Sequence, residues 1–111
     1  MSKEIGKGVK LADLKEFSEG DTFELAENIS WRDIDGELIV LNLQSGEYYT
    51  LNDSARSLWT PLAEGKSIGE IVGAITAEFE APVETVRTDV NFFVNCLIKD
   101  GVLQTQQRKE V

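Results

Sequence analysis

The strongest structural signal in the chain comes from residues 28–51, NISWRDIDGELIVLNLQSGEYYTL. Asp35-Gly36 is a pair favoured in tight hairpin turns, because Gly tolerates a positive φ, and Gln44-Ser45-Gly46 makes a second turn. The two turns separate three β-type runs, residues 28–34, 37–43 and 47–51. We therefore predict an antiparallel three-stranded meander, with the near-continuous apolar run at 37–43 as its central, buried strand.

After Leu51 the apolar spacing changes from every second residue to about every 3.6 residues, which is typical of helices. Asn52 and Asp53 are good caps for a first helix, whose end Pro61 should kink or shorten. The order of elements predicts an α+β fold, a three-stranded antiparallel β-meander followed by three helices, in a winged-helix-like arrangement.

Two further helices follow. Ser67 and Glu70 fit a capping box, in which each side chain bonds to the other residue's backbone N–H. Pro82 suits the start of the third helix, which we expect to end at Gly101. Residues 102–104 then add a short strand or simply pack.

The chain divides into three parts by composition. Residues 1–22 hold three glycines and four lysines, so we expect a flexible N-terminal extension with a transient helix around Leu11, Leu14 and Phe17. The alternative is a segment that folds onto the domain or onto a partner. Residues 23–105 form the folded domain, and residues 106–111 are a polar C-terminal tail.

Charge and hydropathy limit the partners. The net charge is −9, from 20 acidic and 11 basic residues, which makes nucleic acid an unlikely partner because binding depends on neutralising phosphates. The longest apolar run, Leu38 to Leu41, is too short to cross a membrane. A single cysteine and the absence of a signal-peptide pattern at residues 1–10 lead us to expect a cytoplasmic protein.

The sequence offers no set of catalytic residues. It contains no histidine and only one cysteine, which excludes Ser-His-Asp and Cys-His catalysis and Cys-rich metal sites. We expect Cys96 to be a buried, inert thiol. Asp33, Asp35 and Glu37 surround a turn, where acidic residues are favoured for backbone reasons. We therefore expect no enzyme activity, no metal and no cofactor.

The predicted third strand has an unusual edge. Tyr48 and Tyr49 point to opposite faces, and the strand contains no Lys or Pro to protect its edge from pairing. Either another part of the chain covers this edge, or an extended peptide docks on it by backbone pairing. The residues alone leave both interpretations open.

The ordered motifs of residues 28–104 resemble the PqqD family. The hairpin at Asp35-Gly36-Glu37 and the run from Ser45 to Asn52 carry the first part of the resemblance. The later motifs are Ala55, Leu58 and Trp59; Ser67, Glu70, Ile71 and Val72; and Asp89, Val90, Phe93, Leu97, Gly101 and Leu103.

The resemblance implies a peptide chaperone. Such domains recognise the leader segment of ribosomally synthesised, post-translationally modified peptides, including lasso peptides and the precursor of pyrroloquinoline quinone. The leader would pair with the third strand and lie against the third helix. The implied strand residues are Glu47, Tyr48, Tyr49, Thr50 and Leu51, and the implied helical wall is Arg87, Val90, Asn91, Val94 and Leu97.

The resemblance also implies partners. The precursor leader peptide would be presented to a maturation enzyme, such as a protease, a cyclase or a radical-SAM enzyme. The unpaired edge would also allow a weak homodimer, and residues 1–22 could occupy the groove as an autoinhibitory strand.

Two other functions remain as alternatives. A winged-helix DNA-binding regulator is permitted by the order of elements, but the third helix offers only Arg87 and Lys99 as basic residues. A non-catalytic scaffold subunit would not bind the leader at all.

Overall fold

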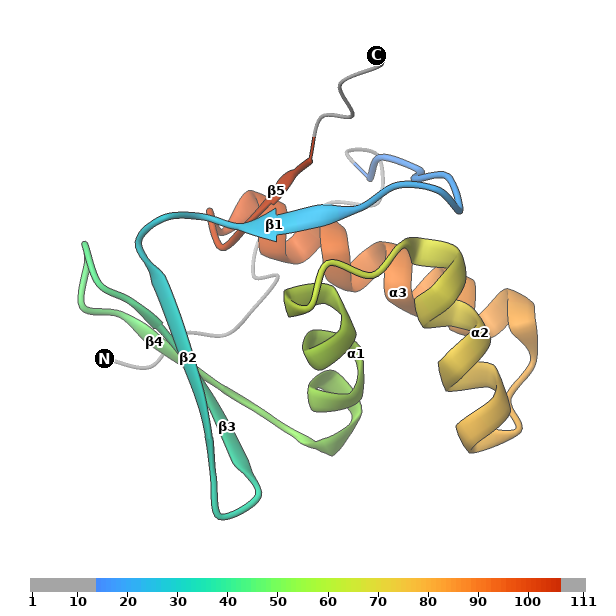
Figure 1. Ribbon diagram of the computed structural model, residues 1–111, viewed down its shortest axis with the longest axis horizontal. Coiled ribbons are helices and arrows are strands. Elements are labelled where there is room, and N and C mark those ends of the chain that lie inside the picture. The colour runs from blue at the N-terminus through green and yellow to red at the C-terminus, as the bar shows by residue number, and fades with distance from the viewer. Residues whose placement is uncertain (1–13, 107–111) are drawn as a thin grey trace.

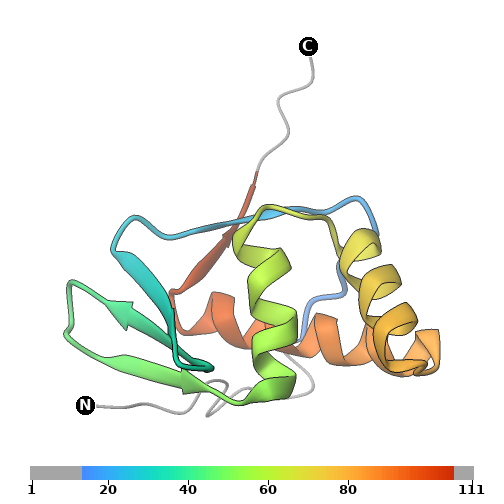
Figure 2. The same cartoon turned by 60° about the horizontal axis from the view of Figure 1, so that its bottom comes forward.

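The computed structural model describes residues 14–106. Its elements are β1 (Phe23–Leu25), β2 (Ile29–Ile34), β3 (Glu37–Asn42), β4 (Tyr48–Leu51), α1 (Asp53–Ala63), α2 (Ile68–Phe79), α3 (Val83–Lys99) and β5 (Leu103–Thr105). The sheet β2-β3-β4 lies at one end and α2 at the other, with α1 between them (Figure 1). Helix α3 runs behind α1, from α2 toward the sheet (Figure 2). The expected α+β class is confirmed.

The meander has the predicted order, with β3 at its centre. Asp35 and Gly36 both have positive φ, 51° and 81°, as the predicted turn between β2 and β3 requires. Arg56 of α1 forms an ion pair with Asp33 and also donates a hydrogen bond to the Gly36 carbonyl. The hairpin is therefore tied to the first helix, which fixes the sheet relative to the helices.

The helix starts follow from their capping residues. The Asn52 side chain accepts a hydrogen bond of 2.9 Å from the Ala55 N–H, and the capping box of Ser67 and Glu70 is complete. The hydrogen bonds that the Glu70 carboxylate accepts from Ser67 lower the pKa of Glu70. Helix α1 continues two residues beyond Pro61, so it is not shortened there. Pro61 lacks one helical N–H, but the buried Leu62 holds the last turn against the core.

A second, two-stranded sheet joins the two ends of the domain. β1 pairs antiparallel with β5, with Phe23 opposite Thr105 and Leu25 opposite Leu103. For residues 102–104 the sequence allowed either a short strand or packing without a strand. It did not predict β1 as a separate strand. Because β1 has only three residues, its pattern is too short to show a period. The pair lies beside α1 and α3.

The core lies between the inner face of the meander and the three helices. Trp59 is its largest buried side chain, and its ring meets Trp31 of β2 edge to face at 6.0 Å. Trp59 is therefore a core residue, and the half-buried Trp31 packs against the core. The other fully buried large side chains are Phe23, Leu38, Val40, Tyr49, Leu62, Ile68, Ile71, Val90, Val94, Leu97 and Val102.

Candidate functional site

The outer edge of β4 is open. Within residues 14–106 this strand pairs only with β3. The Asn42 N–H donates to the Glu47 carbonyl at 2.9 Å, and hydrogen-bonded pairs alternate along an antiparallel ladder. The backbone groups of Tyr49 and Leu51 therefore point toward β3, and those of Tyr48 and Thr50 point outward. The open edge offers a row of unused donors and acceptors to an extended chain.

The side chains of β4 alternate between the core and the surface. Tyr49 and Leu51 are buried, whereas Tyr48 is 38% exposed. Burial raises the pKa of the Tyr49 hydroxyl, and the carboxylates of Asp100 and Glu47 raise it further. Asp100 caps the end of α3, so the inner face of β4 lies beside the C-terminal end of that helix. Tyr49 thus lies between the inner face of β4 and the end of α3.

Three of the expected wall residues are in the core. Val90, Val94 and Leu97 are each 0% exposed. Their spacing along α3 places them on the stripe that packs against the rest of the domain. They pack into the core, and in this structure their side chains are not available to a ligand.

The other two expected wall residues are already occupied. Residues 15–21, here called the N-terminal strap, run along α3. Asn91 accepts a hydrogen bond from the Phe17 N–H and donates one to the Lys15 carbonyl. Asn95 accepts from the Lys15 N–H at 2.9 Å and donates to the Lys15 carbonyl at 2.8 Å. Arg87 forms an ion pair with Glu19. We call Arg87, Asn91 and Asn95 the outer flank of α3.

The strap also caps α2. The N–H groups at the start of a helix have no partner within it, and here the Ile68 N–H donates to the Asp21 carbonyl at 3.0 Å. The Gly69 N–H donates to the Glu19 carbonyl at 2.9 Å. The expected flexible extension began at residue 1, and residues 1–13 lie outside the described residues. From residue 15 onward the segment is bound to two helices.

The close approach of Glu19 to Gly69 gives a testable pair of substitutions. A Cβ at Gly69 would lie 3.2 Å from the Glu19 Cβ and 3.3 Å from its carbonyl oxygen, whereas one at Gly73 would meet nothing within 4 Å. We expect Gly73→Ala to stabilise the protein by about 0.5–1 kcal/mol through helix propensity. Gly69→Ala should show no such gain. Urea denaturation of both variants measures the difference, and equal gains would mean that the strap does not press on α2.

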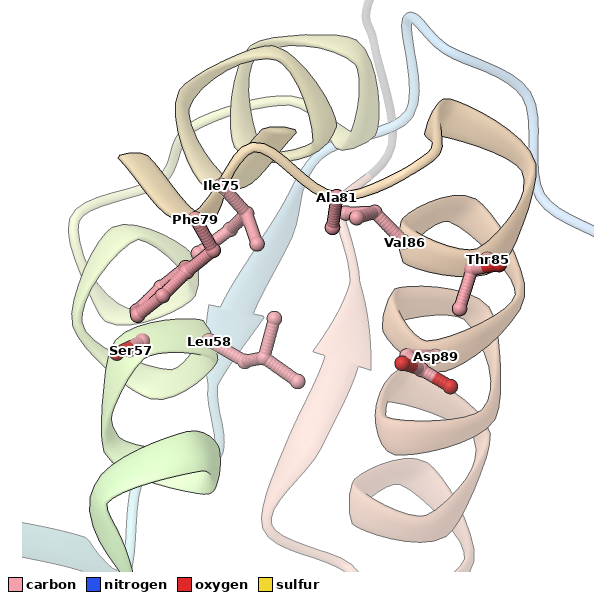
Figure 3. Close-up of a pocket in the computed structure, with 8 residues that line it drawn as sticks. All are labelled: Ser57, Leu58, Ile75, Phe79, Ala81, Thr85, Val86 and Asp89. Carbon is pink, nitrogen blue, oxygen red and sulfur yellow. The ribbon is translucent and has the colours of Figure 1, made fainter. Parts of the chain in front are cut away.

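The opposite side of α3 faces α1 and the core. Thr85, Asp89, Phe93 and Asp100 follow one another at helical spacing; we call them the inner flank of α3. Thr85 and Asp89 face α1 (Figure 3), and Asp100 lies beside Tyr49. Reasoning from the sequence missed this flank. Asp89 and Phe93 were among the motif residues, but the apolar period drew attention to the buried stripe instead.

The described residues show no sign of metal chemistry. From residue 14 to residue 106, no group of three or more acidic or cysteine side chains is placed to hold a metal ion. Cys96 is buried, and burial raises the pKa of its thiol, which disfavours the reactive thiolate. No helix in the same range is long and apolar enough to cross a membrane.

The family model described as coenzyme PQQ synthesis protein D (PqqD) matches residues 37–103, which is more than half of the chain. The chain belongs to the PqqD family. The matched range begins at β3 and includes the open edge of β4 and both flanks of α3. No curated protein matches the sequence.

Two solved structures resemble this PqqD-family chain. A lasso peptide synthetase B1 complexed with its leader peptide is 29% identical, with a TM-score of 0.69, covering 74% of this chain and 96% of its own. TbiB1 in complex with the TbiA(β) leader peptide is 32% identical, with a TM-score of 0.70, covering 77% of this chain and 99% of its own. Both of these PqqD-like structures therefore contain a bound leader peptide.

Proposed function

We propose that this chain binds the leader segment of a ribosomally synthesised, post-translationally modified precursor peptide by adding it as a strand to β4. The observation that carries the proposal is the open edge of β4, whose backbone groups at Tyr48 and Thr50 point away from β3. The two similar structures with bound leader peptides support it. Backbone pairing would supply affinity, and side-chain contacts would supply specificity.

The proposed contacts differ on the two elements. Residues Glu47–Leu51 provide the pairing strand. The side chains of Tyr49 and Leu51 are buried, so these two residues hold the strand in place and do not contact the leader through their side chains. On α3 we propose the side that carries Arg87 and Asn91 as the wall, because Val90, Val94 and Leu97 are buried. Arg87 and Asn91 bind the strap, so a leader could reach them only after the strap leaves.

We propose that the role is non-catalytic. The domain would hold the leader in an extended form and present the core peptide to a maturation enzyme, such as a protease, a cyclase or a radical-SAM enzyme. Tethering the substrate in this way raises its effective concentration at the enzyme. The family match and the two peptide complexes support a binding role.

The DNA-binding alternative finds no support. Both structures similar to this chain are peptide complexes, and Arg87, one of the two basic residues of α3, is paired with Glu19. A scaffold that ignores the leader is the remaining alternative, and the titration described next separates it from peptide capture.

The test is an amide NMR titration of the full chain with the leader peptide of a candidate precursor. A scrambled leader of the same composition is the control. We expect shifts concentrated at Glu47–Leu51 and along Arg87–Leu97 of α3, with the scrambled peptide causing none. Unchanged spectra at saturating leader concentration would contradict the proposal and favour a scaffold.

The same edge makes homodimerisation a separate prediction. Two β4 strands could pair with each other, and a leader would compete for the same backbone groups. We expect weak self-association in sedimentation equilibrium that decreases when the leader is added. A dimer that persists at saturating leader concentration would place the contact elsewhere.

A further inference from the structure

Asn91 and Asn95 hold the N-terminal strap by its backbone. The Asn95 side chain accepts a hydrogen bond from the Lys15 N–H and donates one to the Lys15 carbonyl. The Asn91 side chain accepts one from the Phe17 N–H at 3.0 Å and donates one to the Lys15 carbonyl at 3.1 Å. All four bonds end on main-chain atoms of the strap, so they do not depend on its side chains. We call Asn91 and Asn95 the backbone clamp.

The spacing of the backbone clamp suits an extended chain. Asn91 and Asn95 are four positions apart and share one face of α3, and four residues span roughly 6 Å along a helix. Lys15 and Phe17 are two positions apart, and two residues of an extended chain advance roughly 6.6 Å. Each amide side chain can donate and accept at once. The clamp can therefore bind the backbone of an extended segment of any sequence.

The strap has an anchored part and a clamped part. Residues 18–21 close a turn, in which the Asp21 N–H donates to the Ser18 carbonyl and the Ser18 N–H donates to the Asp21 carboxylate. These residues also cap α2, as described above. Of residues 15–17, Phe17 packs against the core and the other two are exposed. The clamped part, residues 15–17, can therefore open while the anchored part stays on α2.

The strap covers α3 loosely. A cavity of about 730 Å³ is lined by Phe17 of the strap and by Arg87 and Phe92 of α3, so the strap leaves open space beside the helix. The ion pair of Arg87 with Glu19 is at the surface, with side chains 39% and 65% exposed, and exposed pairs contribute little stability. Segments held by exposed hydrogen bonds and few apolar contacts open at a low cost in free energy.

The strap occupies the part of α3 that we propose as the wall for the leader. Arg87 and Asn91 both bind it, and Asn95 continues the same side of the helix by one turn toward the sheet (Figure 2). The hydrogen-bonding groups of the clamp cannot hold two chains at once. Any extended peptide that uses this side of α3 must therefore compete with residues 15–17.

We propose that the strap is an internal competitor of the leader for the backbone clamp. When the leader binds, residues 15–17 leave Asn91 and Asn95 and the leader backbone takes their place, while residues 18–21 stay on α2. The inference rests on the proposed leader binding, and it adds Asn95 as a binding residue and the strap as a regulator. Because only molecules with an open strap offer the clamp, the apparent affinity for the leader falls as the open fraction falls.

The experiment measures the affinity of a fluorescently labelled leader for the full chain by anisotropy. Lys15→Pro removes the N–H that donates to Asn95, at an exposed position outside every helix and strand. We expect it to raise the affinity about fivefold, as for the loss of one competing backbone hydrogen bond. Lys15→Ala keeps the N–H and is the matched control, with an affinity within about twofold of the wild type. Glu19→Gln weakens the strap in a second way and should raise the affinity about twofold at low salt.

Amide hydrogen exchange shows which part of the strap opens. The Lys15 and Phe17 amides are bonded to the clamp, whereas the Ile68 amide is bonded to the Asp21 carbonyl of the anchored part. Saturating leader should speed exchange at Lys15 and Phe17 about tenfold and leave Ile68 protected. A strap with a purely structural role would keep all three amides equally protected with and without the leader.

Asn95→Ala in the Lys15→Pro background tests whether the leader uses the clamp. The strap is already weakened there, so the substitution acts mainly on the leader, and we expect a loss of about fivefold in affinity. In the wild-type background the same substitution should have a smaller effect, because the strap and the leader lose the same contacts. An equal effect in both backgrounds would contradict competition.

The outcomes separate the two proposals. If neither the wild type nor a folded Lys15→Pro variant binds the leader, both proposals fail. If the leader shifts Glu47–Leu51 but Lys15→Pro binds no better than Lys15→Ala, and the Lys15 and Phe17 amides stay protected, the competing strap is overturned and strand addition to β4 stands. Tighter binding by Lys15→Pro together with faster exchange at Phe17 would support the strap as competitor.

Discussion

Thr50→Pro is expected to abolish leader binding without unfolding the domain. Thr50 lies opposite Ile39 in the ladder, at a position whose N–H points away from β3. Proline is tolerated on an edge strand when its missing N–H faces outward. It would remove one donor and block the neighbouring pairing. Losing two backbone hydrogen bonds, each of about 1 kcal/mol, corresponds to a loss of about 30-fold in affinity.

The control for this prediction is Thr50→Ala, which keeps the backbone N–H and changes only an exposed side chain. We expect it to bind within about twofold of the wild type. A leader N-methylated at a paired position tests the same hydrogen bond from the peptide side. Thermal unfolding must show that Thr50→Pro remains folded. Normal affinity in that folded variant would contradict strand addition at β4.

Trp59→Ala is expected to cause the largest loss of stability. Trp59 is 0% exposed and packs against Trp31, and truncating a buried tryptophan costs about 3–5 kcal/mol. Among the described residues its indole N–H has no hydrogen-bond partner, so the cost comes from lost packing and a cavity. This loss is a large part of the 5–15 kcal/mol that stabilises a typical domain. Urea denaturation measures this loss as a change in the free energy of unfolding, with the same slope against urea concentration in both proteins.

The matched comparison is Trp31→Ala, because Trp31 is only half-buried and loses less apolar contact on truncation. We expect a cost of about half that of Trp59→Ala or less. Equal losses would mean that the edge-to-face pair, rather than burial at Trp59, carries the stability of this layer.

The local elements were predictable because short-range chemistry specifies them. Asp35-Gly36 requires a turn with two positive φ angles, and Ser67 with Glu70 caps a helix by hydrogen bonds within four residues. β1 escaped prediction because its partner, β5, is about 80 residues away. Only the assembled helices bring the two together.

The candidate site could be predicted from the sequence on β4 but not on α3. The aromatic, lysine-free edge of β4 was visible in the sequence, since side-chain alternation needs only one strand. On α3, periodicity identified the apolar stripe but could not tell that the strap covers Arg87 and Asn91, because those contacts join residues about 70 positions apart. Asn91 and Asn95, four residues apart, were the available signal for the strap, since amide side chains readily bond to backbone groups.

The pairing of β1 with β5 has a consequence for how the domain forms during synthesis. The β2-β3-β4 meander closes through short turns and can form early, whereas Phe23 must wait for Thr105. Contacts so distant in sequence slow folding. The chain on the ribosome therefore exposes its open β4 edge before the domain is complete. A chaperone that shields strands, or the leader itself, would have its greatest effect on yield in that interval.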